Sequence, residues 1–368
     1  MRTKFLSRVS LGLLLVSGAA GAGSHAVKYT ITTLGLLSGG TFSQAYAINN
    51  AGQVAGTGDE LYSLNGAPPA PVQSAIVWNG TTPTDIEHGE PDYIIDAASP
   101  FAAAINNSGG VVGSFASKGG AFFWSTGYQT TLPNTEFAFA DGINDSGQIV
   151  GSSTPYLAYP FFATFWASAT SEPTALGTLA GFDGGTSGAS GINAAGEIVG
   201  TSSTNSSGKY VSRATRWKGA AVTNLGTLGG ASSGAAAINA YGHIVGWADT
   251  GNNIQHAALW EPTTRAFDLG TLGGKGSYAS GINFEGDVVG SAQTSSGVWH
   301  AVLWTHKHFK AVDLNAEISE KEAQEVTLTD AVGTNDKCMI VANGSNNKTG
   351  AQESYVLSLT DPTNCNEH

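Results

Sequence analysis

At residues 189–200 the chain reads ASGINAAGEIVG, and at residues 279–290 it reads ASGINFEGDVVG. The same frame of small residues, an apolar-Asn pair, a turn and a second apolar pair occurs seven times along the chain. Its asparagines are Asn49, Asn106, Asn144, Asn193, Asn239, Asn283 and Asn335, the last in a degenerate copy. Their intervals of 38 to 57 residues indicate repeats that stack or radiate around an axis, rather than two unrelated domains.

Each repeat predicts four short strands. The first strand ends at the Ile-Asn pair, and an Asn-x-x-Gly turn follows, in which Asn bonds the backbone ahead and Gly adopts a positive φ. The second strand holds the apolar pair before a glycine, and a variable loop follows it. The fourth strand ends near Leu-Gly-Thr-Leu, as at residues 225–228 and 269–272. The third strand ends in a tryptophan, at Trp78, Trp124, Trp166, Trp217, Trp260 and Trp304.

Small residues dominate the first strand of every repeat. An alanine stands three residues before the Ile position, at Ala45, Ala102, Ala140, Ala189, Ala235, Ala279 and Ala331. One residue before that position stands Ala or Gly, at Ala47, Ala104, Gly142, Gly191, Ala237, Gly281 and Gly333. Residues two apart on a strand share a face, so we expect one crowded face of small side chains.

Crowding of this kind is typical of the innermost strands of a β-propeller, whose blades converge at an axis. The tryptophans would fill the wider space between blades further out. We therefore predict an all-β fold, a seven-bladed β-propeller of four-stranded blades. Residues 29–34 look like a fourth strand without a preceding three, and residues 355–359 look like a third strand without a fourth. Together they would complete the seventh blade and hide two sheet edges.

Composition and the N-terminus bear on export. Glycine is 50 of 368 residues, and the 12% charged and 41% hydrophobic content exclude an ordinary disordered chain. Arg2, Lys4 and Arg8 precede an apolar run over residues 11–22 and then small residues, the layout of a secretory signal peptide. We expect a signal peptide over residues 1–26, a propeller over 27–360 and a tail over 361–368. The protein would then be extracellular or periplasmic, with no transmembrane segment.

Charge excludes one class of partner. Removal of residues 1–26 leaves 13 basic and 28 acidic residues, a formal charge of −15. Such a surface repels phosphate backbones, so we expect no nucleic-acid partner. We also expect a monomer without a cofactor.

Two cysteines remain in the exported part. Cys338 occupies a turn position where six repeats have Gly, and Cys365 lies in the tail. The predicted topology places this turn and the end of the last strand on the same face, so a disulfide is reasonable in an oxidising compartment. A free or intermolecular pair is the alternative. No His or further Cys stands at ligand spacing from them, so we expect no metal site.

The variable loops indicate a binding face. In a propeller the loops between strands two and three and those entering each blade emerge on one face, here residues 57–73, 86–100, 152–161, 201–212, 247–255 and 315–328. Aromatic side chains on this face could bind a glycan, a peptide or a protein at the cell exterior. The candidate ligand-binding residues are Tyr62, Tyr93, Tyr156, Tyr159, Trp247 and Trp299.

Two other functions remain open. The alternative is a secreted propeller enzyme acting on polysaccharide, a lyase or a hydrolase, with acids in loops at residues 59–60 and 88–92. No pair of carboxylates recurs across the repeats, so no catalytic residue is assigned. A structural or matrix protein without a specific ligand is the third possibility.

Three motif blocks recur in fixed order: Leu-Gly-Thr-Leu-Gly-Gly at residues 225–230, the Ile-Asn-x-x-Gly-x-Ile-Val-Gly frame, and His-Ala before the tryptophan at residues 256–260 and 300–304. In these blocks the chain resembles the HAF-repeat family of bacterial extracellular repeat proteins, over about residues 28–360. Repeats two, three and seven lack the Leu-Gly-Thr-Leu-Gly-Gly block. The resemblance implies export from a bacterium and supplies no catalytic residue.

Overall fold

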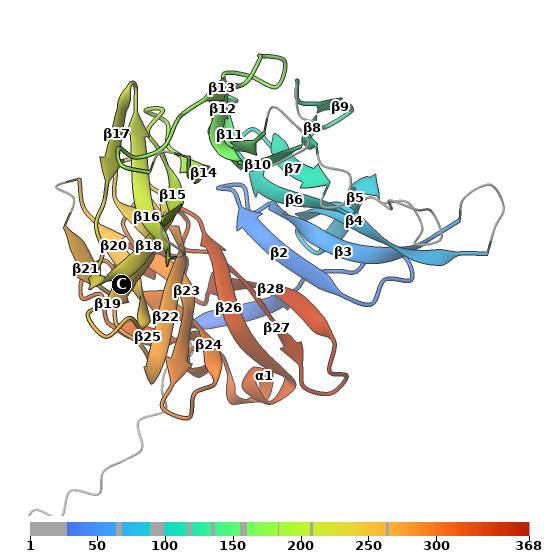
Figure 1. Ribbon diagram of the computed structural model, residues 1–368. Coiled ribbons are helices and arrows are strands. Elements are labelled where there is room, and N and C mark those ends of the chain that lie inside the picture. Colours follow the sequence, from blue (N-terminus) through green and yellow to red (C-terminus); the bar gives the residue numbers. More distant parts are fainter. Residues whose placement is uncertain are drawn as a thin grey trace, which may run out of the picture.

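A computed structural model describes residues 28–63, 68–88, 99–115, 120–133, 137–154, 160–182, 184–206, 209–262 and 265–367. Within these ranges the chain forms seven four-stranded antiparallel sheets. The sheets fan out around one axis, and the first, blue blade lies beside the last, red one (Figure 1). The predicted all-β seven-bladed β-propeller is confirmed. The predicted signal peptide at residues 1–26 lies outside the described residues.

The first six blades each follow the chain from the axis outward. Blade 1 contains β2 (Ser43–Ile48), β3 (Val54–Tyr62), β4 (Ala70–Asn79) and β5 (Thr82–His88). Blade 2 contains β6 (Pro100–Ile105), β7 (Val111–Phe115), β8 (Ala121–Ser125) and β9 (Tyr128–Thr131). Blade 3 contains β10 (Ala138–Ile143), β11 (Ile149–Ser153), β12 (Phe162–Trp166) and β13 (Thr174–Ala175).

The next three blades have the same order. Blade 4 contains β14 (Thr186–Ile192), β15 (Ile198–Ser206), β16 (Lys209–Lys218) and β17 (Ala221–Asn224). Blade 5 contains β18 (Gly229–Ile238), β19 (Ile244–Thr250), β20 (Gln255–Trp260) and β21 (Ala266–Asp268). Blade 6 contains β22 (Gly273–Ile282), β23 (Val288–Thr294), β24 (Trp299–Trp304) and β25 (Ala311–Asp313).

Blade 7 joins the two ends of the chain. Its inner strands are β26 (Val326–Thr334), β27 (Ile340–Asn346) and β28 (Gln352–Leu359), and its outermost strand is β1 (Tyr29–Thr33). β1 pairs antiparallel with β28, from Tyr29 opposite Leu359 to Thr33 opposite Tyr355. The ring is therefore closed by the N-terminal strand, as the sequence predicts.

A short segment between blades 6 and 7 covers the outer edge of β1. It contains the 3-10 turn η1 (Leu314–Ala316) and the helix α1 (Glu320–Glu325). The backbone N–H of Tyr29 donates to the carbonyl of Glu317 at 3.1 Å, and the N–H of Ile31 donates to the carboxylate of Glu322 at 3.3 Å. An edge that could pair with another chain is thus occupied.

The innermost strands correct one sequence-based interpretation. Every one of them carries a β-bulge between its two small positions, so that Ala45 pairs with Gly56 while Ala47 pairs with Ala55. Ala45 consequently packs toward blade 7, and Ala47 packs toward blade 2. The prediction that the two positions share one face is wrong, because the extra residue of a bulge breaks the alternation of side chains.

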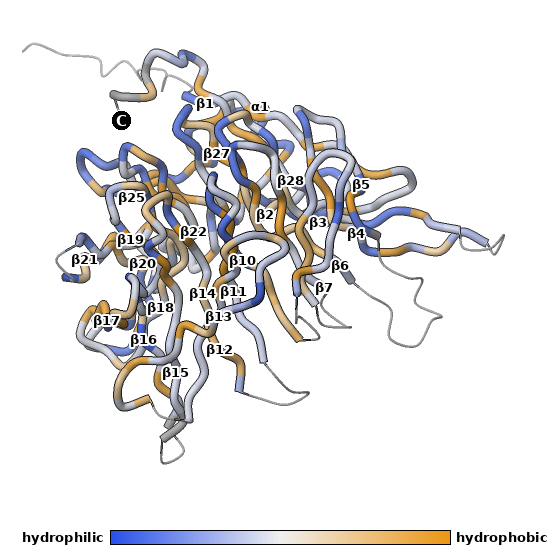
Figure 2. The backbone as a smooth tube through the Cα atoms, turned by 90° about the horizontal axis from the view of Figure 1, so that it is seen from above, coloured by the Kyte–Doolittle hydropathy of each residue, from blue (hydrophilic) through white to orange (hydrophobic). Residues whose placement is uncertain are grey.

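Both small positions still serve close packing near the axis. A methyl group added at Gly142 of blade 3 would lie 3.3 Å from the Cα of Gly191 in blade 4. Further out the tryptophans fill the space between blades: Trp78 packs with Val341 and Val356 of blade 7. Apolar segments lie along inner strands such as β2, β3 and β6, and hydrophilic segments gather at turns (Figure 2).

The C-terminal tail is tied to blade 7. It forms the 3-10 turn η2 (Pro362–Glu367), and Cys365 forms a disulfide with Cys338, with 5.5 Å between the two Cα atoms. Cys338 has a φ of 56°, the left-handed conformation that glycine supplies at the same turn in blades 1 to 6. Among the described residues, no helix has the length and apolar character needed to cross a membrane.

Candidate functional site

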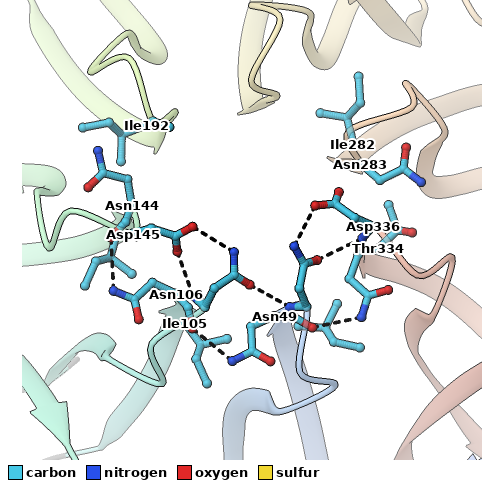
Figure 3. Close-up of a pocket in the computed structure, with 16 residues that line it drawn as sticks. Asn49, Ile105, Asn106, Asn144, Asp145, Ile192, Ile282, Asn283, Thr334 and Asp336 are labelled. Carbon is cyan, nitrogen blue, oxygen red and sulfur yellow. Dashed lines mark hydrogen bonds between the residues drawn. The ribbon is translucent and has the colours of Figure 1, made fainter.

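One end of the central channel is narrow and closed by asparagines. At this end the turns between the first and second strands bring the seven repeat asparagines together in a ring, and Figure 3 shows part of this arrangement around Asn49, Asn106 and Asn144. In six blades the Nδ2 group donates to the backbone carbonyl of the corresponding asparagine in the next blade, at 2.9 to 3.2 Å. In blade 6 Asn283 donates to Asp287 instead. The ring thus joins neighbouring blades, a role that the sequence analysis did not predict.

Each asparagine also holds its own turn. The Oδ1 atom of Asn193, for example, accepts the N–H groups of Ala195 and Glu197, both at 3.0 Å. The motif therefore combines a local turn bond, which the sequence predicts, with a bond between blades. Asn193 is 5% exposed, so both bonds lie away from water.

The carboxylates at the narrow end already have partners. Asp145 accepts the backbone N–H and the side-chain Nδ2 of Asn107 at 2.8 and 2.9 Å. Asp336 accepts the Nδ2 of Asn50 at 2.7 Å and the N–H of Phe284 at 2.9 Å. The cavity here is about 220 Å³ and is also lined by isoleucines of the innermost strands. Its polar groups serve the ring, which leaves little capacity for a ligand.

The channel is wider nearer the long-loop face, which we define as the face that carries the loops between second and third strands. Here a cavity of about 540 Å³ is lined by Tyr46, Phe101, Ala103, Asp141 and Ser190. Four of these are the extra residues of the β-bulges in blades 1 to 4. A bulge can re-aim a side chain, and here it directs each one into the channel. The cavity is therefore a candidate binding site.

Asp141 is the electrostatic centre of this cavity. Its carboxylate makes no hydrogen bond or ion pair with any described residue. Desolvation in the channel wall raises its pKa to about 7. No Lys, Arg or His is among the described residues that line the cavity. A carboxylate held without a partner in a partly desolvated site is available to a ligand.

The aromatic rings form one wall of the cavity. Tyr46 and Phe101 lie edge to face, with ring centroids 6.1 Å apart. Burial raises the pKa of the Tyr46 phenol, which is therefore neutral at physiological pH. The Tyr46 hydroxyl and the Ser190 hydroxyl make no hydrogen bond within the described residues. The cavity thus combines apolar ring surface with polar groups that have no protein partner.

The predicted ligand-binding residues lie elsewhere. Tyr62 ends β3 in blade 1, opposite Ala70, Trp247 lies in β19 of blade 5, and Trp299 begins β24 of blade 6. Trp299 is 37% exposed and packs against Tyr278, with centroids 5.8 Å apart. The described rings therefore belong to three different blades. Tyr93, Tyr156 and Tyr159 lie outside the described residues.

Several predicted loops are shorter than expected. β3 continues to Tyr62 and β4 starts at Ala70, so most of the predicted loop at residues 57–73 is a hairpin. The prediction that Asp59 and Glu60 lie in a loop is wrong, since both belong to β3. Asp59 accepts the N–H groups of Thr41 and Phe42 at 2.6 and 2.9 Å. Burial acts to raise the pKa of Asp59, but these two bonds and the bond from the Thr41 hydroxyl hold it below its usual value.

Asp59 therefore has a structural role, because these bonds hold residues 41 and 42, which precede β2. Glu60 accepts the Ser74 hydroxyl at 3.1 Å. Residues 89–92 of the second proposed acidic loop lie outside the described part of the chain. No observation on the described residues therefore favours the polysaccharide enzyme. The same part of the chain contains no group of three His, Cys, Asp or Glu side chains arranged to hold a metal ion.

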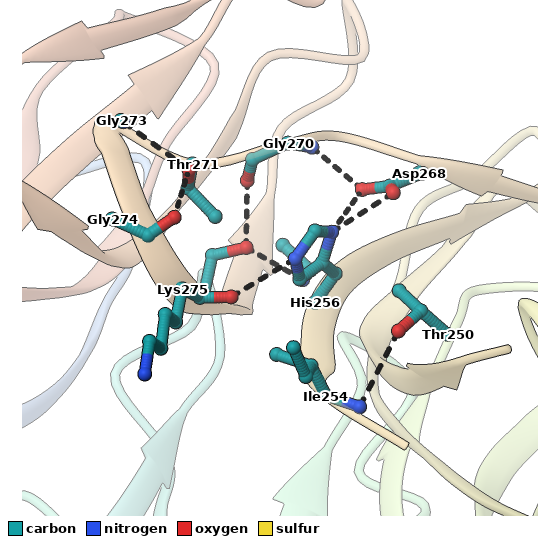
Figure 4. Close-up of polar contacts among 11 residues, drawn as sticks. Thr250, Ile254, His256, Asp268, Gly270, Thr271, Gly273, Gly274 and Lys275 are labelled. Atoms are coloured by element: carbon teal, nitrogen blue, oxygen red, sulfur yellow. Dashed lines mark hydrogen bonds and ion pairs between the residues drawn. The ribbon is translucent and has the colours of Figure 1, made fainter. Parts of the chain in front are cut away.

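The repeated His-Ala element also has a structural role. Nδ1 of His256 in β20 bonds the Asp268 carboxylate at 2.8 Å, and Nε2 lies 3.0 Å from the carbonyl oxygen of Lys275 in blade 6 (Figure 4). His300 repeats the first bond, to Asp313, at 2.7 Å. Ser277 accepts the N–H of Ala257 and donates to the carbonyl of Gly270. The motif blocks of these repeats therefore connect blade 5 with blade 6.

Sequence reasoning missed the cavity, although a signal for it exists. The bulge residues stand between the two small positions of each repeat, at Tyr46, Ala103, Asp141, Ser190, Ala236, Ser280 and Val332. This position varies in size and polarity from blade to blade, while its neighbours remain Ala or Gly. Variation at one position of an otherwise uniform inner strand is the pattern expected of a residue that faces a ligand rather than a neighbouring blade.

Comparison with known proteins gives the fold alone. No family model matches the chain, and no curated protein matches it significantly. The β-propeller domain of the Trilobed protease from Pyrococcus furiosus superposes with a TM-score of 0.58 at 9% identity, covering 87% of this chain and 98% of that chain. A prolyl endopeptidase structure superposes with a TM-score of 0.50 at 11% identity, covering 91% of this chain and 51% of that chain. The chain thus spans about half of the endopeptidase.

Proposed function

We propose that this protein is an exported binding module that recognises a peptide, protein or glycan through the long-loop face and the wide end of its channel. One observation carries the proposal. The bulges of four neighbouring blades direct variable side chains into a cavity of about 540 Å³, where a carboxylate and two hydroxyls have no partner among the described residues. Unsatisfied polar groups beside aromatic rings are typical of a ligand site.

The surroundings of the cavity support this function. The hairpins β3–β4 and β15–β16 have the longest strands of their blades and extend from the ring on the long-loop side (Figure 2). Their exposed residues include Leu61 at 51% and Tyr210 at 66% exposure. A rigid ring with a central cavity and projecting hairpins offers both an anchoring pocket and a wider contact surface.

The remaining parts of the proposal rest on the sequence. We infer export from the N-terminal pattern of residues 1–26 and membership of the HAF-repeat family from the three recurring blocks. Export fits the disulfide between Cys338 and Cys365, because such bonds persist in oxidising compartments. The proposed location is therefore extracellular or periplasmic.

Filling the cavity tests the proposed function. The Ala103→Trp variant places an indole in the channel, and Ala195→Trp places one on an exposed turn at the opposite face. Both variants and the wild-type chain are applied to a glycan array and a random peptide library, after thermal unfolding has confirmed that each is folded. We expect the wild-type chain and Ala195→Trp to retain the same ligands and Ala103→Trp to lose them. Equal retention by Ala103→Trp, or no retention by the wild-type chain, would refute the proposal.

A further inference from the structure

We propose that the group entering the channel is the cationic side chain of a peptide, an arginine guanidinium or a lysine ammonium, bound between the Asp141 carboxylate and the rings of Tyr46 and Phe101. This inference rests on the proposed function and specifies its ligand. It depends on three features of the cavity: an unpaired charge, an aromatic wall and a size suited to an organic group.

The charge of the cavity is uncompensated. Asp141 contributes a carboxylate, and the other lining residues contribute no positive charge. At the narrow end, by contrast, Asp145 and Asp336 each accept bonds from neighbouring turns. A partly desolvated carboxylate without hydrogen-bond donors is unfavourable, and a cation with N–H donors relieves this cost. The two ends therefore differ: the carboxylates at the narrow end have protein partners, whereas Asp141 has none among the described residues and is available to a ligand.

A second buried carboxylate among the described residues, Asp330, is not free in this way. Asp330 in β26 accepts the Ser291 hydroxyl at 2.6 Å and is hydrogen-bonded to Tyr278. Desolvation raises the pKa of Asp330, although both bonds act to lower it. Asp330 is therefore satisfied within the protein, which leaves Asp141 as the carboxylate that lines the cavity without a partner.

The aromatic wall favours an organic cation. Tyr46 and Phe101 lie edge to face at 6.1 Å, so at least one ring face is turned away from the pair. A cation near such a face is attracted by the negative π surface, and a guanidinium can also stack on it. Neutral sugars would also stack on these rings, but they would leave the Asp141 charge uncompensated.

The size and donor set argue against a metal ion as the ligand. The cavity has a volume of about 540 Å³, and Asp141 is the one carboxylate among its described lining residues. Calcium and magnesium need about six oxygen ligands at short distances, which this set of side chains does not supply. The volume suits the end of a long side chain, whose planar or tetrahedral head can bond one carboxylate and contact two rings.

The hairpins favour a polypeptide as the source of this cation. Leu61 and Tyr210 are exposed apolar side chains near the tips of the two projecting hairpins, in blades 1 and 4. The cavity is lined by residues of the same blades and of the two between them. A chain lying over this sector could insert one basic side chain and cover apolar surface with its neighbours. The net negative charge would attract such a basic ligand.

The test compares two peptides that differ in charge alone. The probes are the capped tripeptides Gly-Arg-Gly and Gly-citrulline-Gly, since citrulline replaces the guanidinium by a neutral urea of nearly the same shape. Isothermal titration calorimetry with the full chain should show binding of the arginine peptide about ten-fold or more tighter than the citrulline peptide. The capped Gly-Lys-Gly peptide should also bind more tightly than the citrulline peptide.

Two variants locate the effect. Asp141→Asn keeps the shape of the side chain and should remove the preference for arginine over citrulline. Asp145→Asn, at the narrow end, should keep it. Equal affinities of the two peptides for the wild-type chain, no peptide binding, or an unchanged preference in Asp141→Asn would each refute the inference. A glycan retained by the wild-type chain and lost by Ala103→Trp would in that case leave the proposed function intact while excluding a basic peptide as its ligand.

Discussion

Asp141 is held in the channel by one extra backbone residue. The bulge in β10 lets Ala140 and Gly142 pack against opposite neighbouring blades while the residue between them points to the axis. The same backbone device places tyrosine, alanine and serine in blades 1, 2 and 4. Side chains at this position can therefore change without disturbing the packing between blades, which makes them suitable for specificity.

Replacing Asp141 should change the pH dependence of stability. Desolvation raises the pKa of Asp141 to about 7, above the value of about 3.9 expected in the unfolded chain. The carboxyl therefore ionises first in the unfolded chain, and the native state loses stability as the pH rises from about 4 to about 7. Asp141→Asn removes this loss, so we expect its Tm to exceed that of the wild-type chain by about 2–4 °C at about pH 8.5.

At about pH 4 the two proteins should have nearly equal Tm values, because the wild-type carboxyl is then largely protonated in the folded state and only partly ionised in the unfolded one. Tyr46, the other titratable side chain that lines the cavity, stays neutral over this range. Differential scanning calorimetry across the range measures the effect. A difference in Tm that does not vary with pH would show that folding does not raise the pKa of Asp141, against this account.

The residues of the inner strands and of the blade interfaces differ in how far the sequence alone reveals their positions. The tryptophans and the small residues were recognisable because seven repeats reveal them as recurring positions. Their faces were only partly predictable, since Ala45 and Ala47 are two apart and yet pack toward different blades. A bulge depends on the pairing of two strands, which the spacing of residues in one strand does not encode. The cavity was missed for the same reason.

At the scale of elements, β1 depends on partners from both ends of the chain. It pairs with β28 on one side, and the segment from η1 to α1 covers its other side. Glu322 accepts both the N–H of Ile31 and, in a capping box, the N–H and hydroxyl of Ser319. Burial acts to raise the pKa of Glu322, but these hydrogen bonds keep it below its usual value. The closing strand and the helix therefore stabilise one another.

Removal of the closing strand should be severely destabilising. Deleting residues 27–35 leaves the edge of β28 unpaired and removes the N–H donors to Glu317 and Glu322, so we expect Tm to fall by more than about 10 °C. A synthetic peptide of residues 27–35 should restore much of the loss when added to the shortened protein. Thermal unfolding followed by circular dichroism measures both effects.

The matched control is the same peptide with Thr32→Pro. The N–H groups of Tyr29 and Ile31 point outward to Glu317 and Glu322, so the N–H of Thr32 faces β28 in the antiparallel ladder. Proline removes this donor, and the peptide should fail to restore stability. Rescue by the proline peptide, or an unchanged Tm after the deletion, would show that β1 is dispensable. The sequence predicted this strand correctly because an incomplete repeat at each end left one strand unpaired.

At the scale of the whole molecule, the asparagine ring joins blade 7 to blade 1 in the same way as it joins blades that are adjacent in sequence. Asn335 of blade 7 donates to the carbonyl of Asn49 in blade 1 at 2.9 Å, as Asn193 of blade 4 donates to Asn239 in blade 5 at 3.2 Å. Each also accepts two N–H groups of its own turn at 3.0 Å. The first and last repeats are therefore joined by the same bond as repeats adjacent in sequence.

This equivalence predicts equal effects of two substitutions far apart in the chain. Asn193→Ala and Asn335→Ala each remove one bond between blades and two buried turn bonds, and each should lower the free energy of unfolding by about 2–4 kcal/mol. Asn107→Ala, which removes two side-chain bonds at an exposed position, to Asp145 and from the N–H of Asn50, should cost less than about 1 kcal/mol. Urea unfolding measures all three. In an open array Asn335 would have no partner blade, so a loss of unfolding free energy for Asn335→Ala well below that for Asn193→Ala would contradict the closed ring. Equal losses would show that the contact between blades 7 and 1 stabilises the protein as much as a contact between blades adjacent in sequence.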